Sequence, residues 1–230
     1  MKITVINGNQ RHGSTWNCKE LFLRELAGYE GVETKEFTLP KDLPHFCVGC
    51  FSCFSNGEQT CPHRESVSPI VAALEEADLF IFTSPIYAMD VSGPMKSLLD
   101  HLCFMWMSHR PNPRMFRKVG LIITTTAGAG SSHARKTLKC SLRFWGVNRI
   151  FSFNPSVSAM KWDDVKPEKK AKLEQIIKKQ SLRIARAVEN AGHAPRNPVS
   201  SILFRIMRSM MKKNTWNLYD RSHWERNGWL

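Results

Sequence analysis

Short runs of mostly apolar residues alternate along the chain with longer segments in which apolar and polar residues mix. Residues 3–6, 79–83 and 118–125 form the clearest runs, and residues 33–39 and 149–153 form two weaker ones. Continuous apolar runs of this length are typical of strands in a parallel sheet, which are buried on both faces. The pattern therefore predicts about five strands.

Between the strands, apolar residues recur three and four positions apart, as they do on one face of a helix. Ser92 and Pro94 are typical of a helix start, because serine can cap free N–H groups and proline is tolerated in the first turn. The predicted helices cover residues 16–29 and 65–77, a segment that starts at Ser92, and residues 131–145 and 167–191. Strands that alternate with helices predict an α/β fold, a doubly wound parallel sheet of about five strands.

A loop rich in hydrogen-bond donors follows the first predicted strand, with the sequence Asn7-Gly-Asn-Gln-Arg-His-Gly-Ser-Thr15. Glycines, hydroxyls and an arginine in front of a helix can direct several donors at one anion. The loop lacks the lysine of a nucleoside-triphosphate P-loop and the G-x-G-x-x-G of a dinucleotide site, so it favours a monophosphate such as that of FMN. The alternative is a simple strand-to-helix turn, with Gly13 providing its geometry and Ser14 the helix N-cap.

Two further loops follow predicted strands and should lie at the same edge of the sheet, where open α/β folds bind ligands. Residues 84–90 include Tyr87, which could stack on a planar ring or simply cover the sheet. Residues 126–130 are all small, which allows a ligand to approach the backbone closely. We expect the three loops to form one binding site.

Four of the seven cysteines are grouped in one short segment, at Cys47, Cys50, Cys53 and Cys61. Their spacing, with Pro62 after the last, resembles the runs that hold an iron–sulfur cluster and not the two separated pairs of a zinc knuckle. A structural zinc ion, a redox disulfide, or thiols that bind no metal are the alternatives. His45 and His63 flank the run, and we interpret them as polar surface residues.

Composition limits the class of protein. With 230 residues, 42% of them hydrophobic, the chain is long enough for one well-buried domain with an appendix. We expect no export signal, and no apolar run reaches membrane-spanning length. The odd number of cysteines fits a reducing compartment better than a disulfide framework, so we expect a cytoplasmic protein.

The net charge is +13, and residues 161–230 carry 16 Lys and Arg residues against 7 Asp and Glu residues. A basic surface can contact anionic lipid, nucleic acid or phosphorylated ligands, but more often it is a solvated face. Because no nucleic-acid-binding motif accompanies the charge, we predict no nucleic-acid partner. Residues 202–213 predict a basic amphipathic helix that lies on a membrane surface or, as we favour, docks on the chain's own body or a dimer mate.

Taken together, the three loops and the cysteine run resemble the flavodoxin-like NAD(P)H-dependent FMN reductase family, in particular its iron–sulfur flavoprotein branch. The resemblance covers most of residues 1–190. It implies an FMN-binding domain at residues 1–194, with a cysteine loop at 45–62, and a basic C-terminal helical extension at residues 195–230. The implied FMN contacts come from the three loops and are Asn9, Arg11, Ser14, Thr15, Trp16, Pro85, Ile86, Tyr87, Ala88, Met89, Thr126, Ala127 and Gly128. The implied metal ligands are Cys47, Cys50, Cys53 and Cys61.

The resemblance also implies an activity. FMN would take electrons from NAD(P)H or a ferredoxin-like donor and pass them to a small acceptor such as a quinone, a flavin or a nitro compound, through a [4Fe-4S] cluster where one is bound. Because the cofactor performs this chemistry, no catalytic side chain is predicted. Members of the family are usually homodimers or homotetramers. The alternative function is a flavin-containing electron carrier that docks to a redox partner or a membrane through its basic tail.

Overall fold

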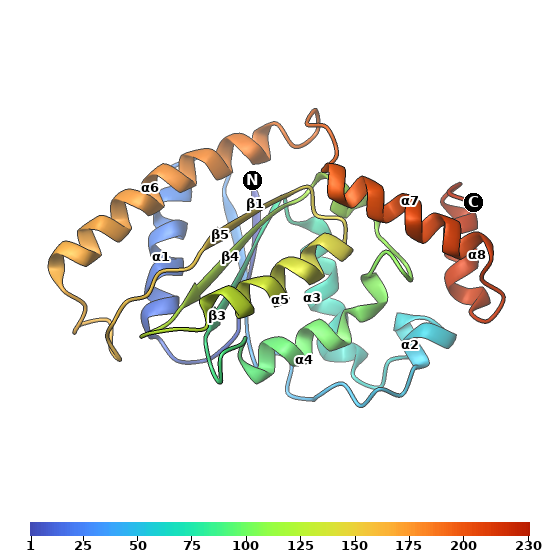
Figure 1. Ribbon diagram of the computed structural model, residues 1–230, viewed down its shortest axis with the longest axis horizontal. Helices are drawn as coiled ribbons and strands as arrows, with labels where there is room; N and C mark the ends of the chain where they lie inside the picture. The colour runs from blue at the N-terminus through green and yellow to red at the C-terminus, as the bar shows by residue number, and fades with distance from the viewer.

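Five parallel strands form the sheet at the centre of the computed structural model, which describes residues 1–230 (Figure 1). The strands are β1 (Lys2–Asn7), β2 (Glu33–Thr38), β3 (Leu79–Pro85), β4 (Val119–Thr125) and β5 (Arg149–Phe153). Their order is β2-β1-β3-β4-β5, and every neighbouring pair is parallel. This order is that of flavodoxin-like folds, so the predicted fold class is confirmed.

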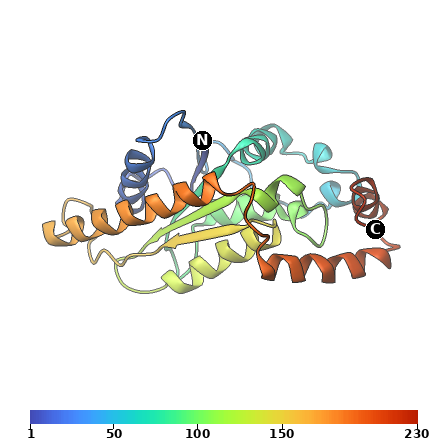
Figure 2. The same cartoon turned by 90° about the horizontal axis from the view of Figure 1, so that it is seen from above.

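Helices cover both faces of the sheet. Their bounds are α1 (Ser14–Leu26), α2 (Ser52–Ser55), η1 (Glu58–Thr60), α3 (Arg64–Glu76), α4 (Gly93–His101), η2 (Cys103–Met105), η3 (Pro113–Arg117), α5 (Ser131–Phe144), α6 (Pro167–Glu189), α7 (Pro198–Lys212) and α8 (Leu218–Arg226). One face of the sheet carries α1 and α6, and the other carries α3, α4 and α5 (Figure 1, Figure 2). The structure is therefore the predicted doubly wound arrangement.

Each face of the sheet has its own hydrophobic core. In β3, Phe80 and Phe82 pack under α3, α4 and α5, whereas Leu79 and Ile81 pack under α1 and α6. All four side chains are fully buried. A strand that is covered on both faces needs apolar residues at successive positions, which explains why continuous apolar runs located the central strands.

The starts of two helices test the expected caps. The Ser92 hydroxyl accepts a hydrogen bond from the Met95 N–H (3.4 Å), and Pro94 lies in the first turn of α4, as predicted. The alternative role of Ser14 as an N-cap is wrong, because α1 begins at Ser14 itself and Gly13 is the N-cap. Since Gly13 has no side chain, no side-chain cap occupies the N–H groups of the first turn of α1.

The C-terminal segment folds back on the rest of the chain. Helix α7 lies against α5, and α8 lies against α2 in the cysteine loop (Figure 1). Trp224 of α8 is fully buried, and its Nε1 donates a hydrogen bond to the His109 carbonyl (2.7 Å). Of the placements expected for the tail, the structure has the one on the chain's own body. None of the helices combines the length and the apolar character that a membrane crossing requires.

Candidate functional site

The loops that follow β1, β3 and β4 meet at the carboxyl edge of the sheet and line one cavity of about 200 Å³. Parallel strands end at the same edge, which brings together loops that are far apart in the sequence. The lining residues come from these loops and from the segment after β5, and they are Asn9, Arg11, Gly13, Ser14, Thr15, Pro85, Ile86, Tyr87, Thr125, Thr126, Ala127, Val157, Ala159 and Met160. The expected convergence of the three loops is present.

The loop after β1 presents donors to this cavity. Because α1 begins without a side-chain cap, the N–H groups of its first turn are available to an anion. Arg11 lies exposed at the rim, where its Nη2 donates a hydrogen bond to the Met160 carbonyl (2.7 Å). The buried hydroxyls of Thr15 and Thr125 are 2.6 Å apart, which ties the first loop to the end of β4.

The loop after β3 forms a tight turn at the mouth of the cavity. Tyr87 and Asp90 exchange two backbone hydrogen bonds of 3.0 Å each, and Ala88 and Met89 between them have φ angles of 47° and 69°. A positive φ is uncommon for residues other than glycine and indicates a constrained turn. The turn leaves the Tyr87 side chain 48% exposed, with Asn9 Nδ2 donating to its hydroxyl (3.3 Å).

The loop after β4 packs closely against this turn. Gly130, the N-cap of α5, has a φ angle of 95°. A Cβ atom at Gly130 would lie 2.9 Å from Ile86 Cγ2 and 3.1 Å from the Met89 Cα. Both distances are shorter than ordinary contacts, so only glycine allows the two loops to approach in this way.

A second cavity, of about 70 Å³, lies in the cysteine loop. Its lining includes all four clustered cysteines and two histidines, and it consists of Cys47, Val48, Gly49, Cys50, Phe51, Cys53, Phe54, Cys61, Pro62, His63, Asp100 and His101. Burial raises the pKa of the Cys53 thiol to about 11; Arg110 opposes this rise, and the thiolates of Cys61, Cys47 and Cys50 add to it. The other three cysteines of the run therefore lie in the neighbourhood of Cys53 and line the same cavity.

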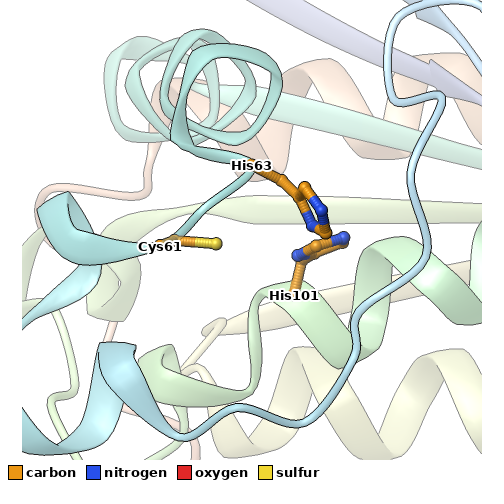
Figure 3. A group of neighbouring side chains, drawn as sticks. All are labelled: Cys61, His63 and His101. Atoms are coloured by element: carbon orange, nitrogen blue, oxygen red, sulfur yellow. The ribbon is translucent and has the colours of Figure 1, made fainter.

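The interpretation of the flanking histidines as polar surface residues agrees with the exposed His45 and only in part with His63. Its half-buried ring stacks on His45 at 4.9 Å and lies next to Cys61 and His101 (Figure 3). The pKa of His63 is lowered, mainly by burial and to a smaller extent by the neighbouring imidazoles of His101 and His45. Sequence reasoning did not identify His101, because it belongs to α4, about 40 residues beyond the cysteine run.

A buried ion pair connects the cysteine loop to α8. Arg110 and Asp220 are both buried, and Arg110 Nη1 forms a close ion pair with Asp220 Oδ1. Arg110 Nη2 donates to the Cys53 carbonyl (2.5 Å), and His109 Nδ1 lies 2.7 Å from Asp220 Oδ2. The C-terminal helix thereby helps to position the backbone of a predicted metal ligand.

A larger cavity, of about 770 Å³, lies elsewhere, between α5 and α7. Its apolar lining includes Phe144, Val199, Ile202 and Ile206, and basic side chains of α5 surround it. None of the predicted site residues lines it. Size alone therefore does not mark the site, whereas the convergence of loops at the sheet edge does.

Residues 1–161 match the model of the family described as NADPH-dependent FMN reductase. The chain belongs to this family. The family predicted from the sequence is therefore confirmed.

Individual proteins similar to this chain in sequence or in fold are consistent with its place in the FMN reductase family. An iron-sulfur flavoprotein of Archaeoglobus fulgidus is 25% identical over 146 residues, which are 63% of this chain and 63% of that protein. An iron-sulfur flavoprotein of Methanocaldococcus jannaschii is 25% identical over 196 residues, 83% of this chain and 94% of that protein. The structure of an FMN-dependent NADH-azoreductase from Bacillus anthracis in complex with FMN shares the fold, with a TM-score of 0.64 and 13% identity over 80% of this chain and 100% of that one. The match to the Archaeoglobus protein spans less than two thirds of its length.

Nine of the thirteen residues that the FMN reductase resemblance implied as FMN contacts line the cavity at the sheet edge. The four outside its lining are Trp16, Ala88, Met89 and Gly128. Trp16 stacks on His12 instead (4.5 Å between ring centres). Sequence reasoning missed the segment after β5, which contributes Val157, Ala159 and Met160. The rule that parallel strands end at one edge could have identified this segment.

Proposed function

We propose that the chain is an FMN-dependent oxidoreductase that takes electrons from NAD(P)H and passes them to a small acceptor. The observation that carries this proposal is the convergence of three loops and an uncapped helix start on one cavity, in a chain of the FMN reductase family. The azoreductase of the same fold binds FMN, which supports the same cofactor here.

The residues around the cavity fit the phosphate end of FMN. The first turn of α1 offers free N–H groups, Ser14 adds a hydroxyl, and Arg11 adds a positive charge at the rim. The cavity of about 200 Å³ is smaller than the roughly 300–1,000 Å³ of pockets that enclose a whole ligand. It therefore suits the phosphate and ribityl chain, with the ring system at the open rim.

Bound FMN would supply the redox chemistry, accepting a hydride from NAD(P)H and giving two electrons to an acceptor such as a quinone, a flavin or a nitro compound. The chain's own residues bind and orient the ring. Tyr87 offers an exposed aromatic face. The backbone N–H groups of Ala88 and Met89 donate no hydrogen bond within their turn, so they can donate to the ring. The open rim gives both the nicotinamide and the acceptor access to the ring.

We also propose that the four clustered cysteines hold a [4Fe-4S] cluster, which would supply single-electron transfer. The support is that all four cysteines line one cavity, and that relatives are named iron-sulfur flavoproteins. Cys47 and Cys50 are exposed, so the cluster would lie near the surface, within reach of a redox partner.

The proposal extends to the organisation of the chain. We assign residues 1–194 to the FMN-binding domain and residues 195–230 to an extension that supports the cysteine loop through Asp220 and Arg110. We propose a homodimer or homotetramer that works in the cytoplasm, where thiols stay reduced.

Replacing Arg11 or Tyr87 with alanine should weaken FMN binding. Loss of a charged donor should raise the dissociation constant about tenfold or more, and loss of aromatic stacking about 2- to 10-fold. Titration of flavin fluorescence measures both effects. Arg117→Ala is the matched control, because this exposed arginine lies just before β4, at the opposite edge of the sheet. Unchanged affinity in both test variants would contradict the placement of FMN.

Protein purified without oxygen should contain about four iron and four sulfide ions per chain, with broad brown absorption beneath the flavin bands. Cys50→Ser should lose the iron and the sulfide but keep the flavin bands. Cys140→Ser should keep both, because Cys140 is exposed on α5 and does not line the cysteine cavity. Wild-type protein with flavin bands but no iron would exclude the cluster and leave the FMN proposal intact.

A further inference from the structure

Three metal-ligating side chains converge at the end of the cysteine loop: Cys61 and His63, which are two residues apart, and His101 of α4. The Sγ of Cys61 and one ring nitrogen each of His63 and His101 lie within 4.8 Å of one another (Figure 3). In a tetrahedral site with bonds of about 2.0–2.3 Å, the ligand atoms are about 3.3–3.8 Å apart. Small side-chain movements therefore suffice to bring all three atoms onto one ion.

His101 is already oriented as a ligand. It is buried, and its Nε2 lies 3.0 Å from the His45 carbonyl oxygen. A carbonyl can only accept, so Nε2 carries the proton and Nδ1 keeps its lone pair. A histidine ligand that donates its other N–H to a backbone carbonyl is the usual outer-sphere arrangement of metal sites, because it fixes the tautomer and the ring.

His45 also holds the second histidine. Its ring stacks on the His63 ring, with centres 4.9 Å apart and planes at 20°, while His63 meets His101 edge to face at 5.3 Å. One residue therefore supports both imidazoles, through its carbonyl and its ring. Two imidazoles and one thiolate suit zinc and neighbouring divalent ions, with the fourth position open to water. The nearby carboxylate of Asp100 is already bound to Lys96 (2.5 Å).

We propose that Cys61, His63 and His101 bind one divalent transition-metal ion, zinc in the cell, when the chain lacks an iron–sulfur cluster. On binding, the Cys61 thiol releases its proton to solvent and its sulfur coordinates the ion. Cys61 is also one of the four cysteines proposed to hold the cluster, so the two occupancies exclude each other. The ion would keep Cys61 and the start of α3 ordered in the cluster-free protein. This site does not depend on the flavin reaction.

Cobalt(II) is the probe, because thiolate coordination gives it strong charge-transfer and visible bands in a tetrahedral site. Full-length protein, freed of iron by oxidation and chelation and then reduced, is titrated with Co²⁺. We expect one Co²⁺ per chain with tetrahedral bands, displaced by Zn²⁺. Absence of these bands in the wild-type protein overturns the proposal, whatever the FMN content of the sample.

The variants identify the ligands. His101→Asn and His63→Ala should each weaken Co²⁺ binding more than about 100-fold, because even outer-sphere changes cost 10- to 100-fold. His63 is only half-buried, so its variant remains informative if His101→Asn does not fold. Cys50→Ser is the matched control and should bind Co²⁺ as the wild type does. Binding that survives in both histidine variants but fails in Cys50→Ser assigns the ion to the four cysteines and overturns the proposal.

Discussion

Replacement of Asp220 by alanine is expected to lower the free energy of unfolding by about 3–5 kcal/mol, because it removes the buried partner of a buried arginine. Arg110 then keeps only Glu58, a half-exposed carboxylate 3.2 Å away, as an ion-pair partner. Asp220 is fully buried and Arg110 is 6% exposed. Besides the close ion pair with Arg110, Asp220 accepts a hydrogen bond from Asn217 Nδ2 (2.9 Å) and lies beside His109 (2.7 Å). Arg110, Asn217 and His109 therefore each lose one interaction at once.

The effect should reach the cysteine loop through Arg110. Its guanidinium lies over the rings of Phe104 (5.4 Å) and Tyr219 (5.0 Å) and donates to the Cys53 carbonyl (2.5 Å). Without Asp220, the guanidinium gains most by moving to water, which removes the donor to Cys53. We therefore expect the variant to lose iron faster than the wild type in the presence of a chelator.

Urea unfolding followed by circular dichroism measures the change in stability. The matched control is Asp100→Ala, because the Lys96–Asp100 pair is exposed and such pairs contribute about 0–1 kcal/mol. Asp220→Asn should fall between the two, since it keeps the shape and the hydrogen-bond acceptor but not the charge. A loss below about 1 kcal/mol in Asp220→Ala would mean that the ion pair does not hold α8 to the body.

The fold was predictable where burial on both faces of a strand requires apolar residues at consecutive positions. Strands β1, β3 and β4 are covered on both faces, and their sequences are continuous apolar runs. The edge strand β2 has four exposed residues, from Glu33 to Glu36, so its pattern is much weaker. Helix caps were less certain, because Gly13 and Ser14 both suit a helix start and only the backbone path decides between them.

The cavity at the sheet edge was predictable because a topological rule, rather than contacts between side chains, brings its loops together. Contacts between distant residues were not predictable. Nothing in the neighbourhood of Asp220 indicates that its carboxylate is buried, since its partner Arg110 is 110 positions away. From the sequence, His101 likewise looks like an ordinary residue of an amphipathic helix. Only the folded chain places it beside Cys61.

Replacement of Gly130 by alanine should weaken FMN binding, whereas replacement of Gly128 should not. Gly130 has a φ angle of 95°, in the region where a residue with a side chain is strained by about 1–3 kcal/mol. Its new Cβ atom would also press on Ile86 and on the backbone of Met89. Since the backbone of the turn cannot yield as a side-chain tip can, we expect residues 86–89 to shift away from the cavity mouth.

If this turn holds the flavin ring, a penalty of about 1–3 kcal/mol corresponds to a dissociation constant about 5- to 150-fold higher. Flavin fluorescence titration measures it. Gly128→Ala is a strict control in the same loop, because a Cβ atom there would have no atom within 4 Å. Equal loss in both variants would indicate that the loop itself contacts FMN at Gly128, as the family resemblance implied. Wild-type affinity in Gly130→Ala would mean that the turn after β3 does not hold the ring, because the new Cβ atom presses on Ile86 and Met89 of that turn.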